Sequence, residues 1–332
     1  MKPCIIGSSG PVLLPEESAV LRAEAPAGII LFARNIENPT QLSALMRDLR
    51  AALPGETAFM VDQEGGRVAR LKPPHWRAHP PARAIGALHA RDAEAGLRAA
   101  WLTGALIGLQ CRAAGFSVVA APVLDVAAAD GHNVIGDRAY GADPAAVAAL
   151  AASMARGLLA AGVQPVGKHA PGHGRARADS HLELPILADV TVSDLLPFRE
   201  NAWLPWMMTA HIRYTARDML NPATVSPAIV AGIIRADTPG LGFTGVLTTD
   251  DLAMGALSGS PGERAARAIA AGCDIALHCS GVLAESADVL AALPEISSAA
   301  AARLTAARKM AAEAAQKLDE ASLAAERGGL PA

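Results

Sequence analysis

In the stretch Val163-Gln164-Pro165-Val166-Gly167-Lys168-His169-Ala170-Pro171-Gly172-His173-Gly174, a short apolar run is followed at once by ionisable side chains. The run, Val163–Val166, predicts a β-strand. Gly and Pro then interrupt regular structure, so Lys168 and His169 are expected on a loop that this strand holds. Ionisable groups crowded onto a loop at a strand end are typical of an active site.

The same order of elements recurs along the chain. Short apolar runs predict strands, and the longer segments rich in Ala, Leu and Arg between them predict helices. The predicted strands are Gly28–Phe32, Ala58–Val61, Phe116–Ala120, Val163–Val166, Trp206–Met208, Val246–Leu247 and Ile275–Leu277. The predicted helices are Ala93–Ala113, Pro144–Ala161, Ser193–Asn201, Ser226–Arg235, Gly262–Ala271 and Ser297–Ala325, with Ser193 and Ser226 as N-terminal caps. This alternation indicates parallel strands joined by helical crossovers.

Polar side chains follow nearly every predicted strand. They are Arg34-Asn35, Asp62-Gln63-Glu64, Asp125, Lys168-His169, His211, Asp250-Asp251 and His278. In (β/α)8 barrels the active site is assembled at this end from several strands. The absence of a Gly-rich dinucleotide fingerprint after the first predicted strands counts against a doubly wound sheet. We therefore expect an α/β protein with a single (β/α)8 TIM-type barrel, in one domain over residues 1–332.

The composition argues against several classes of function. Hydrophobic residues make up 52% and charged residues 18% of the 332 residues, so the chain can bury a large core. A formal net charge of −3 without a long basic run argues against a nucleic-acid partner. Neither a membrane span nor a signal peptide is expected, which favours a cytoplasmic location. The four cysteines lack metal-ligand spacing, and we expect neither a metal nor a cofactor.

Thr248-Thr249-Asp250-Asp251 follows the predicted strand that ends at Leu247. Asp250 is the first side chain expected to project from this strand end into the barrel mouth. A carboxylate there can act as a nucleophile, a general base or a metal ligand. The alternative is an N-terminal cap on an alanine-rich helix. Asp251 suits the cap better, which leaves Asp250 for chemistry.

Further polar groups are expected at the same mouth. Asp62 and Arg70 suit adjacent sugar hydroxyls, because one only accepts and the other only donates hydrogen bonds; the alternative is a local salt bridge. Arg138 can reach the mouth from its loop, unless it is a solvated surface charge. His173, between two glycines, is expected to tie its loop down by hydrogen bonding rather than to touch a substrate.

These motifs, taken in order, resemble glycoside hydrolase family 3, and more narrowly its bacterial β-N-acetylhexosaminidases. The resemblance rests on Lys168-His169-x-Pro171-Gly172-His173-Gly174 with Asp179-Ser180-His181, on Asp62-Gln63-Glu64-Gly65-Gly66-Arg67, and on Thr249-Asp250-Asp251-x-x-Met254. Gly28–Asn35, Pro122–Asp125 and Pro222–Pro227 also match, so the resemblance spans roughly Gly28 to Cys279.

The resemblance implies a retaining mechanism through a covalent glycosyl-enzyme. Asp250 matches the nucleophile, and His181 matches the general acid/base with Asp179 as its charge partner. Asp62, Arg70, Arg138, Lys168 and His169 match positions that bind the terminal N-acetylglucosamine, and His211 and Met254 match positions that line the pocket. The implied partner is a small carbohydrate, either an N-acetylglucosaminide or a 1,6-anhydromuropeptide of cytoplasmic cell-wall recycling.

Two features depart from the family pattern. Ala170 stands where an aromatic residue is usual, which is expected to loosen the packing behind Lys168. The linker Gly174–Ala178 replaces a more acidic one, which is expected to alter the mobility of the acid/base loop. Neither departure removes a reactive atom.

Other activities remain open at this point. A metal-dependent amidohydrolase on the same barrel requires a His-x-His pair after the first strand, and Gly28–Asn35 contains no histidine. A family 3 N-acetylglucosaminide phosphorylase is compatible with a histidine acid/base, because an imidazole does not repel phosphate. A β-glucosidase is a third alternative. A non-enzymatic sugar-binding protein is expected to lack Asp250 or the Asp179–His181 pair, and both are present.

Overall fold

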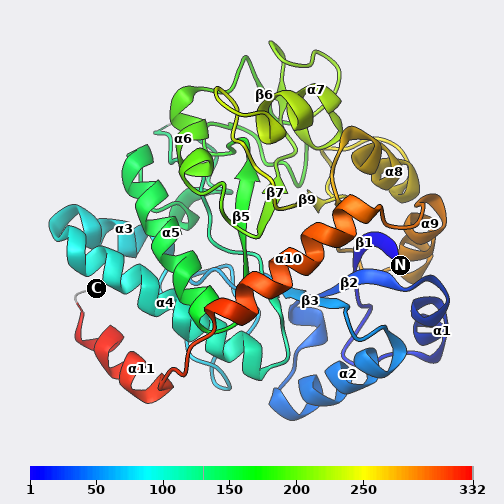
Figure 1. Ribbon diagram of the computed structural model, residues 1–332, viewed down its shortest axis with the longest axis horizontal. Helices are drawn as coiled ribbons and strands as arrows, with labels where there is room; N and C mark the ends of the chain where they lie inside the picture. Colours follow the sequence, from blue (N-terminus) through cyan, green and yellow to red (C-terminus); the bar gives the residue numbers. More distant parts are fainter. Residues whose placement is uncertain (130, 331–332) are drawn as a thin grey trace.

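The computed structural model describes residues 1–129 and 131–330. Within them, eight parallel strands close into a barrel in the order β1-β10-β9-β7-β5-β4-β3-β2 (Figure 1). The strands are β1 Lys2–Gly7, β2 Pro26–Leu31, β3 Ala58–Val61, β4 Val118–Val119, β5 Gln164–Ala170, β7 Trp206–Thr209, β9 Val246–Asp251 and β10 Ile275–His278. The expected (β/α)8 fold class is confirmed.

Strand β1 is missing from the sequence-based prediction. It closes the barrel between β2 and β10, with Ile5 opposite both Gly28 and Leu277. The strand is buried from Pro3 to Gly7. A six-residue run with Pro near one end and Gly at the other is too short for its pattern to distinguish strand from coil. Its pairing on both edges, which is long-range, decides its structure.

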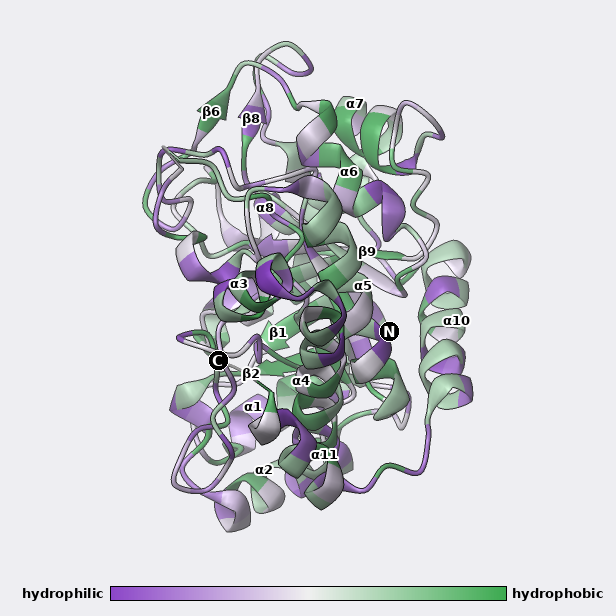
Figure 2. Cartoon of the chain, turned by 90° about the vertical axis from the view of Figure 1, so that its left-hand side faces the viewer, coloured by the Kyte–Doolittle hydropathy of each residue, from purple (hydrophilic) through white to green (hydrophobic). Residues whose placement is uncertain are grey.

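Helices cover the outside of the barrel, and the hydrophobic colouring of α4 and α5 in Figure 2 marks two that pack deeply against it. Their bounds are α1 Pro15–Glu24, α2 Pro39–Ala52, α3 Ala82–Arg91, α4 Ala93–Ala113, α5 Pro144–Ala160, α6 Val192–Glu200, α7 Pro227–Ile229, α8 Pro261–Ala271, α9 Leu283–Ala292, α10 Ser298–Ala314 and α11 Glu320–Gly329. Short 3₁₀ turns occupy Ala33–Asn35, Gly136–Arg138 and Ala223–Val225. No helix among the described residues combines the length and apolar character needed to cross a membrane.

Three helix predictions need correction. The segment Ser297–Ala325 is two helices, α10 and α11, rather than one. Helix α7 ends after one turn and continues as a π-helix over Val230–Arg235; Ser226 caps it as predicted, by accepting a hydrogen bond from the Ile229 N–H. Helix α6 is capped by Thr191, not Ser193, because the Thr191 hydroxyl and the Asp194 carboxylate form a reciprocal capping box.

Two strands extend further than their apolar runs. Strand β5 continues through Lys168 and His169 to Ala170, so these two residues lie in the strand and not on a loop after it. Strand β9 likewise continues through Asp250 and Asp251. A prediction from hydrophobic pattern places the end of a strand at its first polar residue. In the structure, backbone pairing with the neighbouring strands continues past that residue. The polar side chains are therefore held by the sheet itself.

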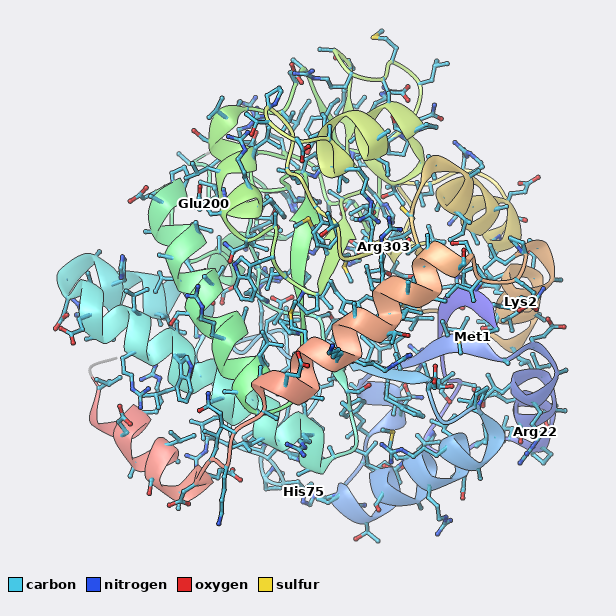
Figure 3. All side chains as sticks on the ribbon, in the orientation of Figure 1. Met1, Lys2, Arg22, His75, Glu200 and Arg303 are labelled. Atoms are coloured by element: carbon cyan, nitrogen blue, oxygen red, sulfur yellow. The ribbon has the colours of Figure 1, made fainter. Side chains whose placement is uncertain are left out.

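Helix α10 lies across the N-terminal end of the barrel (Figure 1). Arg303, labelled in Figure 3, donates to Asp274 Oδ1 at 2.7 Å, and Arg235 donates to the other oxygen at 2.7 Å. Asp274 Oδ2 also accepts the Leu247 N–H at 2.9 Å, directly at the start of β9. This network ties α10 to the N-terminal ends of β9 and β10, and the C-terminal ends of the strands lie at the opposite end of the barrel.

Candidate active site

A cavity of about 240 Å³ opens at the C-terminal end of the barrel. Side chains from β2, β5, β7, β9 and β10 and from the segments that follow β2, β3, β4, β5, β9 and β10 line it. They are Ile30, Phe32, Asp62, Glu64, Arg67, Val68, Arg70, Val134, Arg138, Lys168, His169, His181, Met208, Asp250, Asp251, Met254, Leu277 and Cys279. A larger hollow of about 550 Å³ lies on the outer wall between α2 and α4. We place the site in the smaller cavity, because ionisable groups from several strands converge there.

One wall of the cavity is a network of paired charges. Lys168 Nζ lies 2.6 Å from Glu64 Oε1 and 2.9 Å from Asp62 Oδ1. Arg138 binds both oxygens of Glu64 at 2.8 Å, and Arg70 Nη2 lies 3.3 Å from Asp62 Oδ2. Buried charges are tolerated when they are paired and hydrogen-bonded in this way. Asp62, Arg70, Arg138 and Lys168 thus meet as the sequence predicted, and Arg138 is not a solvated surface charge.

Glu64 was quoted in the motif but was not assigned to the site. Its side chain is only 6% exposed and joins Lys168 to Arg138. A usable signal was present, since Asp62 and Glu64 are two residues apart and an extended chain places such residues on one face. The Nε of Arg70 is buried without a hydrogen-bond partner among the described residues. The Arg70 side chain as a whole lines the cavity and is 23% exposed, so its guanidinium can donate to a hydroxyl group of a ligand.

The charge network controls the ionisation of its members. Burial alone would raise the pKa of Glu64, but the charges and hydrogen bonds of Arg138 and Lys168 lower it from 4.5 to about 2. Burial likewise opposes ionisation of Asp62, and Lys168 and Arg70 hold the pKa of Asp62 below its usual value. Both carboxylates are therefore ionised at neutral pH and serve as acceptors only.

These pKa shifts predict how Glu64 contributes to stability at different pH values. Because its folded-state pKa is depressed, its contribution is present above about pH 4.5 and is lost as the pH falls towards 2. We expect Glu64→Gln to lack this contribution, roughly 3 kcal/mol at most. Urea unfolding of both proteins at about pH 6 and about pH 3 should show the gap in unfolding free energy narrowing at the lower pH. A gap that is independent of pH would contradict the assigned ionisation.

Asp125 and His169 form a second buried pair behind the cavity. His169 Nδ1 donates to Asp125 Oδ2 at 2.6 Å, and His169 Nε2 lies 3.4 Å from Arg138 Nη2 on the cavity side. Asp125 Oδ1 accepts the backbone N–H of His173 at 2.6 Å. Asp125 had been noted only as one of the polar residues that follow strands. His173 ties its loop down through Ser180, whose hydroxyl lies 3.0 Å from His173 Nε2, and it does not line the cavity.

Asp250 lies in β9, and its side chain lines the cavity. Its Oδ1 accepts the Asp251 N–H at 2.8 Å. Burial alone would raise the pKa of Asp250, but nearby His169, that hydrogen bond and the charge of Lys168 hold it below its usual value, so the group is an anion. Asp251 does not cap a helix, since none begins there; its Oδ1 accepts the N–H groups of Ala253 and Cys279, both at 2.9 Å.

Asp179 and His181 form a hydrogen-bonded pair on the loop after β5. The ring Nδ1 and the backbone N–H of His181 lie 2.8 and 2.9 Å from Asp179 Oδ1, respectively. The His181 side chain is 61% exposed and lines the cavity. The carbonyl of His181 accepts the Gly255 N–H at 3.0 Å. The loop therefore rests on the segment that follows Asp250, so the imidazole and the Asp250 carboxylate share one cavity.

His211 and Met254 differ in their placement. Met254 lines the cavity. His211 is fully buried behind it, where Nε2 donates to the Asp251 carbonyl at 2.9 Å and Nδ1 lies 2.7 Å from the Thr224 hydroxyl. Burial lowers the pKa of His211, which favours the neutral ring. The structure thus places His211 where it supports the backbone beside Asp250, not where it would contact a ligand.

The linker Gly174–Ala178 is anchored at its start. Arg175 donates to both oxygens of Asp194, at 2.7 to 3.1 Å, and to the Asp189 carbonyl at 2.6 Å. Gly174 packs so closely on Val126 that an added Cβ would lie 1.8 Å from the Val126 carbonyl oxygen. In residues 1–129 and 131–330, no cluster of three or more His, Cys, Asp or Glu side chains is arranged to hold a metal ion.

Comparison with known proteins identifies the family. Residues 14–314 match the model of the glycosyl hydrolase family 3 N-terminal domain. The chain belongs to glycosyl hydrolase family 3. Among curated family relatives, the beta-hexosaminidase of Bordetella avium is 39% identical over 288 residues, which cover 83% of this chain and 80% of the relative. The beta-hexosaminidase of Tolumonas auensis is 39% identical over 84% of this chain and 83% of its own length.

Solved structures agree with this assignment to family 3. NagZ from Neisseria gonorrhoeae, solved in complex with N-trifluoroacetyl-D-glucosamine, superposes with a TM-score of 0.86 at 32% identity, covering 100% of this chain and 98% of that one. A family 3 beta-N-acetylglucosaminidase from Paenibacillus superposes with a TM-score of 0.83 at 30% identity, covering 98% of this chain and 66% of that one. The resemblance to family 3 is confirmed, and it takes the place of the amidohydrolase alternative.

Proposed function

We propose that this family 3 glycoside hydrolase is a retaining β-N-acetylhexosaminidase that releases terminal β-linked N-acetylglucosamine from small soluble glycans. The observation that carries the proposal is that an ionised carboxylate, Asp250, and the imidazole of His181, hydrogen-bonded to Asp179, line the same 240 Å³ cavity. The curated relatives bear the name beta-hexosaminidase, and the NagZ structure carries an N-acylated glucosamine.

In the first step, Asp250 attacks the anomeric carbon. His181 protonates the glycosidic oxygen as the bond to the leaving alcohol breaks, which leaves a glycosyl ester on Asp250. In the second step, the neutral imidazole removes a proton from water as the water oxygen attacks the anomeric carbon, and the bond between that carbon and the Asp250 carboxylate breaks. This regenerates both residues and retains the anomeric configuration. Asp179 accepts a hydrogen bond from Nδ1 of His181, which orients the ring for both proton transfers.

The charge network is suited to holding the sugar. Lys168 uses two of its three N–H donors on Asp62 and Glu64, so one remains for a hydroxyl. The Arg70 guanidinium lines the cavity and only donates hydrogen bonds, and Asp62 beside it retains acceptor capacity. We assign Asp62, Arg70, Arg138, Lys168 and His169 to sugar binding on this basis. The physiological substrate that we propose is a 1,6-anhydromuropeptide in cytoplasmic cell-wall recycling.

A substrate panel tests the proposed activity. N-acetylglucosaminides, glucosides and purified anhydromuropeptides should be compared, with the anomer of the product followed by NMR from the first turnovers. We expect free β-N-acetylglucosamine, with anhydromuropeptides preferred over glucosides. Sugar 1-phosphate as the main product in phosphate buffer would instead identify a phosphorylase, and preferred cleavage of glucosides would identify a β-glucosidase.

A mechanism-based label tests the nucleophile separately. An N-acetylglucosaminyl fluoride with fluorine at C5 should form an ester that hydrolyses slowly, because fluorine destabilises the oxocarbenium-like transition state. Peptide mapping is expected to place the label on Asp250. Asp251 and Glu64 line the same cavity and serve as internal controls. A label on either of them would contradict the assignment.

A further inference from the structure

Asp125 lies at a junction between the sugar-binding wall and the loop that carries His181. Its side chain is fully buried after β4. Oδ2 accepts from His169 Nδ1 and Oδ1 accepts from the His173 N–H, both at 2.6 Å. His169 faces the cavity and belongs to β5, whereas His173 opens the loop after β5. The Asp125 carboxylate therefore holds one residue of the sugar-binding wall, His169, and one residue of the loop that carries His181, namely His173.

The connection continues from His173 to the acid/base. His173 and Ser180 are each 2% exposed, and the Ser180 hydroxyl lies 3.0 Å from His173 Nε2. Ser180 immediately precedes His181, and its carbonyl accepts the Ala256 N–H at 3.3 Å. Burial lowers the pKa of His173 to about 4, so this link is made by a neutral ring at neutral pH. The chain of contacts thus runs without a gap from His169 through Asp125 to the base of His181.

We propose that Asp125 is a positioning residue that couples recognition of the sugar by His169 to the placement of the acid/base His181. This inference rests on the proposed glycosidase function. Asp125 does not line the cavity and so acts only through its partners. When a sugar hydroxyl engages Nε2 of His169, the ring is held in place by Asp125, and the same carboxylate holds the start of the loop that must deliver the proton.

Asp125 also sets the tautomer of His169. A carboxylate only accepts hydrogen bonds, so Nδ1 of His169 carries a proton. Nδ1 thus faces Asp125, and Nε2 lies on the side of Arg138 and the cavity, 3.4 Å from Arg138 Nη2.

The isosteric variant Asp125→Asn cannot keep both hydrogen bonds of Asp125, the one from His169 and the one from the His173 N–H. An amide has one acceptor oxygen, but His173 N–H and His169 Nδ1–H both need an acceptor. If the amide oxygen stays on His173, the amide NH₂ faces Nδ1 and forces the proton of His169 onto Nε2. If the oxygen stays on His169, the loop loses its anchor. The shape of the side chain is unchanged in both cases.

Nitrogen-15 NMR of the histidine rings tests the first half of the proposal without relying on activity. In the wild type we expect His169 to be protonated on Nδ1, and in Asp125→Asn to be protonated on Nε2 or to show two ring environments. His169→Gln identifies the signal. An unchanged Nδ1–H tautomer together with an unchanged signal of the His173 amide would overturn the proposal. This NMR readout tests the role of Asp125 even if the wild type has no N-acetylhexosaminidase activity. A lack of that activity would overturn the proposed function but would leave the NMR result on Asp125 standing.

Kinetics test the coupling to the acid/base. We expect Asp125→Asn to lower kcat/KM by about 10²-fold on an N-acetylglucosaminide with a poor leaving group, and by much less on the 4-nitrophenyl substrate, because a displaced acid costs most where protonation is needed. The loss should largely disappear when His181 is already alanine. Equal losses on both substrates, or losses that multiply with His181→Ala, would refute the coupling.

Two further variants keep this test decisive. Asp274→Asn is a matched control, because Asp274 is also a buried carboxylate that accepts a backbone N–H and a cationic side chain, but at the opposite end of the barrel. We expect it to lower Tm without altering the ratio between the two substrates. Ser180→Ala removes the last link and is informative even if Asp125→Asn does not fold. It should give the same leaving-group pattern, and a uniform loss would count against the relay.

Discussion

Asp250→Ala is expected to lower kcat/KM on 4-nitrophenyl N-acetyl-β-glucosaminide by about 10⁴-fold or more, the scale seen when a covalent nucleophile is removed. The carboxylate lies in β9 and lines the cavity as an anion. Without it, neither the displacement nor charge stabilisation of the oxocarbenium-like transition state is available. Because β9 is held by pairing with β7 and β10, we expect the variant to fold. Steady-state assays at a concentration verified by Tm measure the effect.

Adding azide to Asp250→Ala tests specifically whether the missing group is the nucleophile. A small anion can occupy the space of the missing carboxylate and attack the anomeric carbon from the same face. The product should be an α-glycosyl azide, in contrast to the β-configured product of the wild type. Asp251→Ala is the matched control, because Asp251 lines the cavity too but its Oδ1 is engaged with two backbone N–H groups. Near-normal turnover by Asp250→Ala would rule out Asp250 as the nucleophile.

The fold class could be predicted from strong local sequence patterns. The elements that were missed or cut short depend on pairing between segments that are distant in the sequence. Helix α4 was predicted with the bounds that the structure shows, because a long Ala- and Leu-rich segment is helical on local grounds. Strand β1 and the extension of β5 through Lys168 and His169 depend on neighbouring strands in the barrel. No periodicity over six residues reveals such pairing.

The same distinction applies to the site. Asp62, Arg138 and Lys168 could be grouped because each lies at or beyond the C-terminal part of a strand, and the barrel brings these strand ends together. Glu64 and Asp125 were not assigned, since their importance lies in what they contact: Glu64 lies between Lys168 and Arg138, and Asp125 between two histidines. His211 was misplaced because a residue next to a strand end can point behind the cavity as well as into it. Side-chain direction there depends on local register, which the sequence alone does not fix.

His181→Ala should show a loss that depends on the leaving group. We expect kcat/KM to fall by about 10²- to 10⁴-fold on an alkyl N-acetylglucosaminide, and by about tenfold or less on the 4-nitrophenyl substrate. A nitrophenolate departs without protonation, whereas an alkoxide needs the proton that His181 supplies. The ring is 61% exposed, and its deletion leaves no cavity in the core, so the fold should be retained.

Asp179→Asn removes the negative charge beside His181 but keeps a hydrogen-bond acceptor there. The amide oxygen can still accept from Nδ1 and the backbone N–H of His181, both of which now contact Asp179 Oδ1, so the geometry of the turn is kept. The negative charge beside the ring is lost, so we expect kcat/KM to fall on the alkyl N-acetylglucosaminide and to change little on the 4-nitrophenyl substrate. A purely structural role of Asp179 would not give this dependence on the leaving group. If His181→Ala and Asp179→Asn instead lost activity equally on both substrates, the proton donor would have to be sought elsewhere in the cavity.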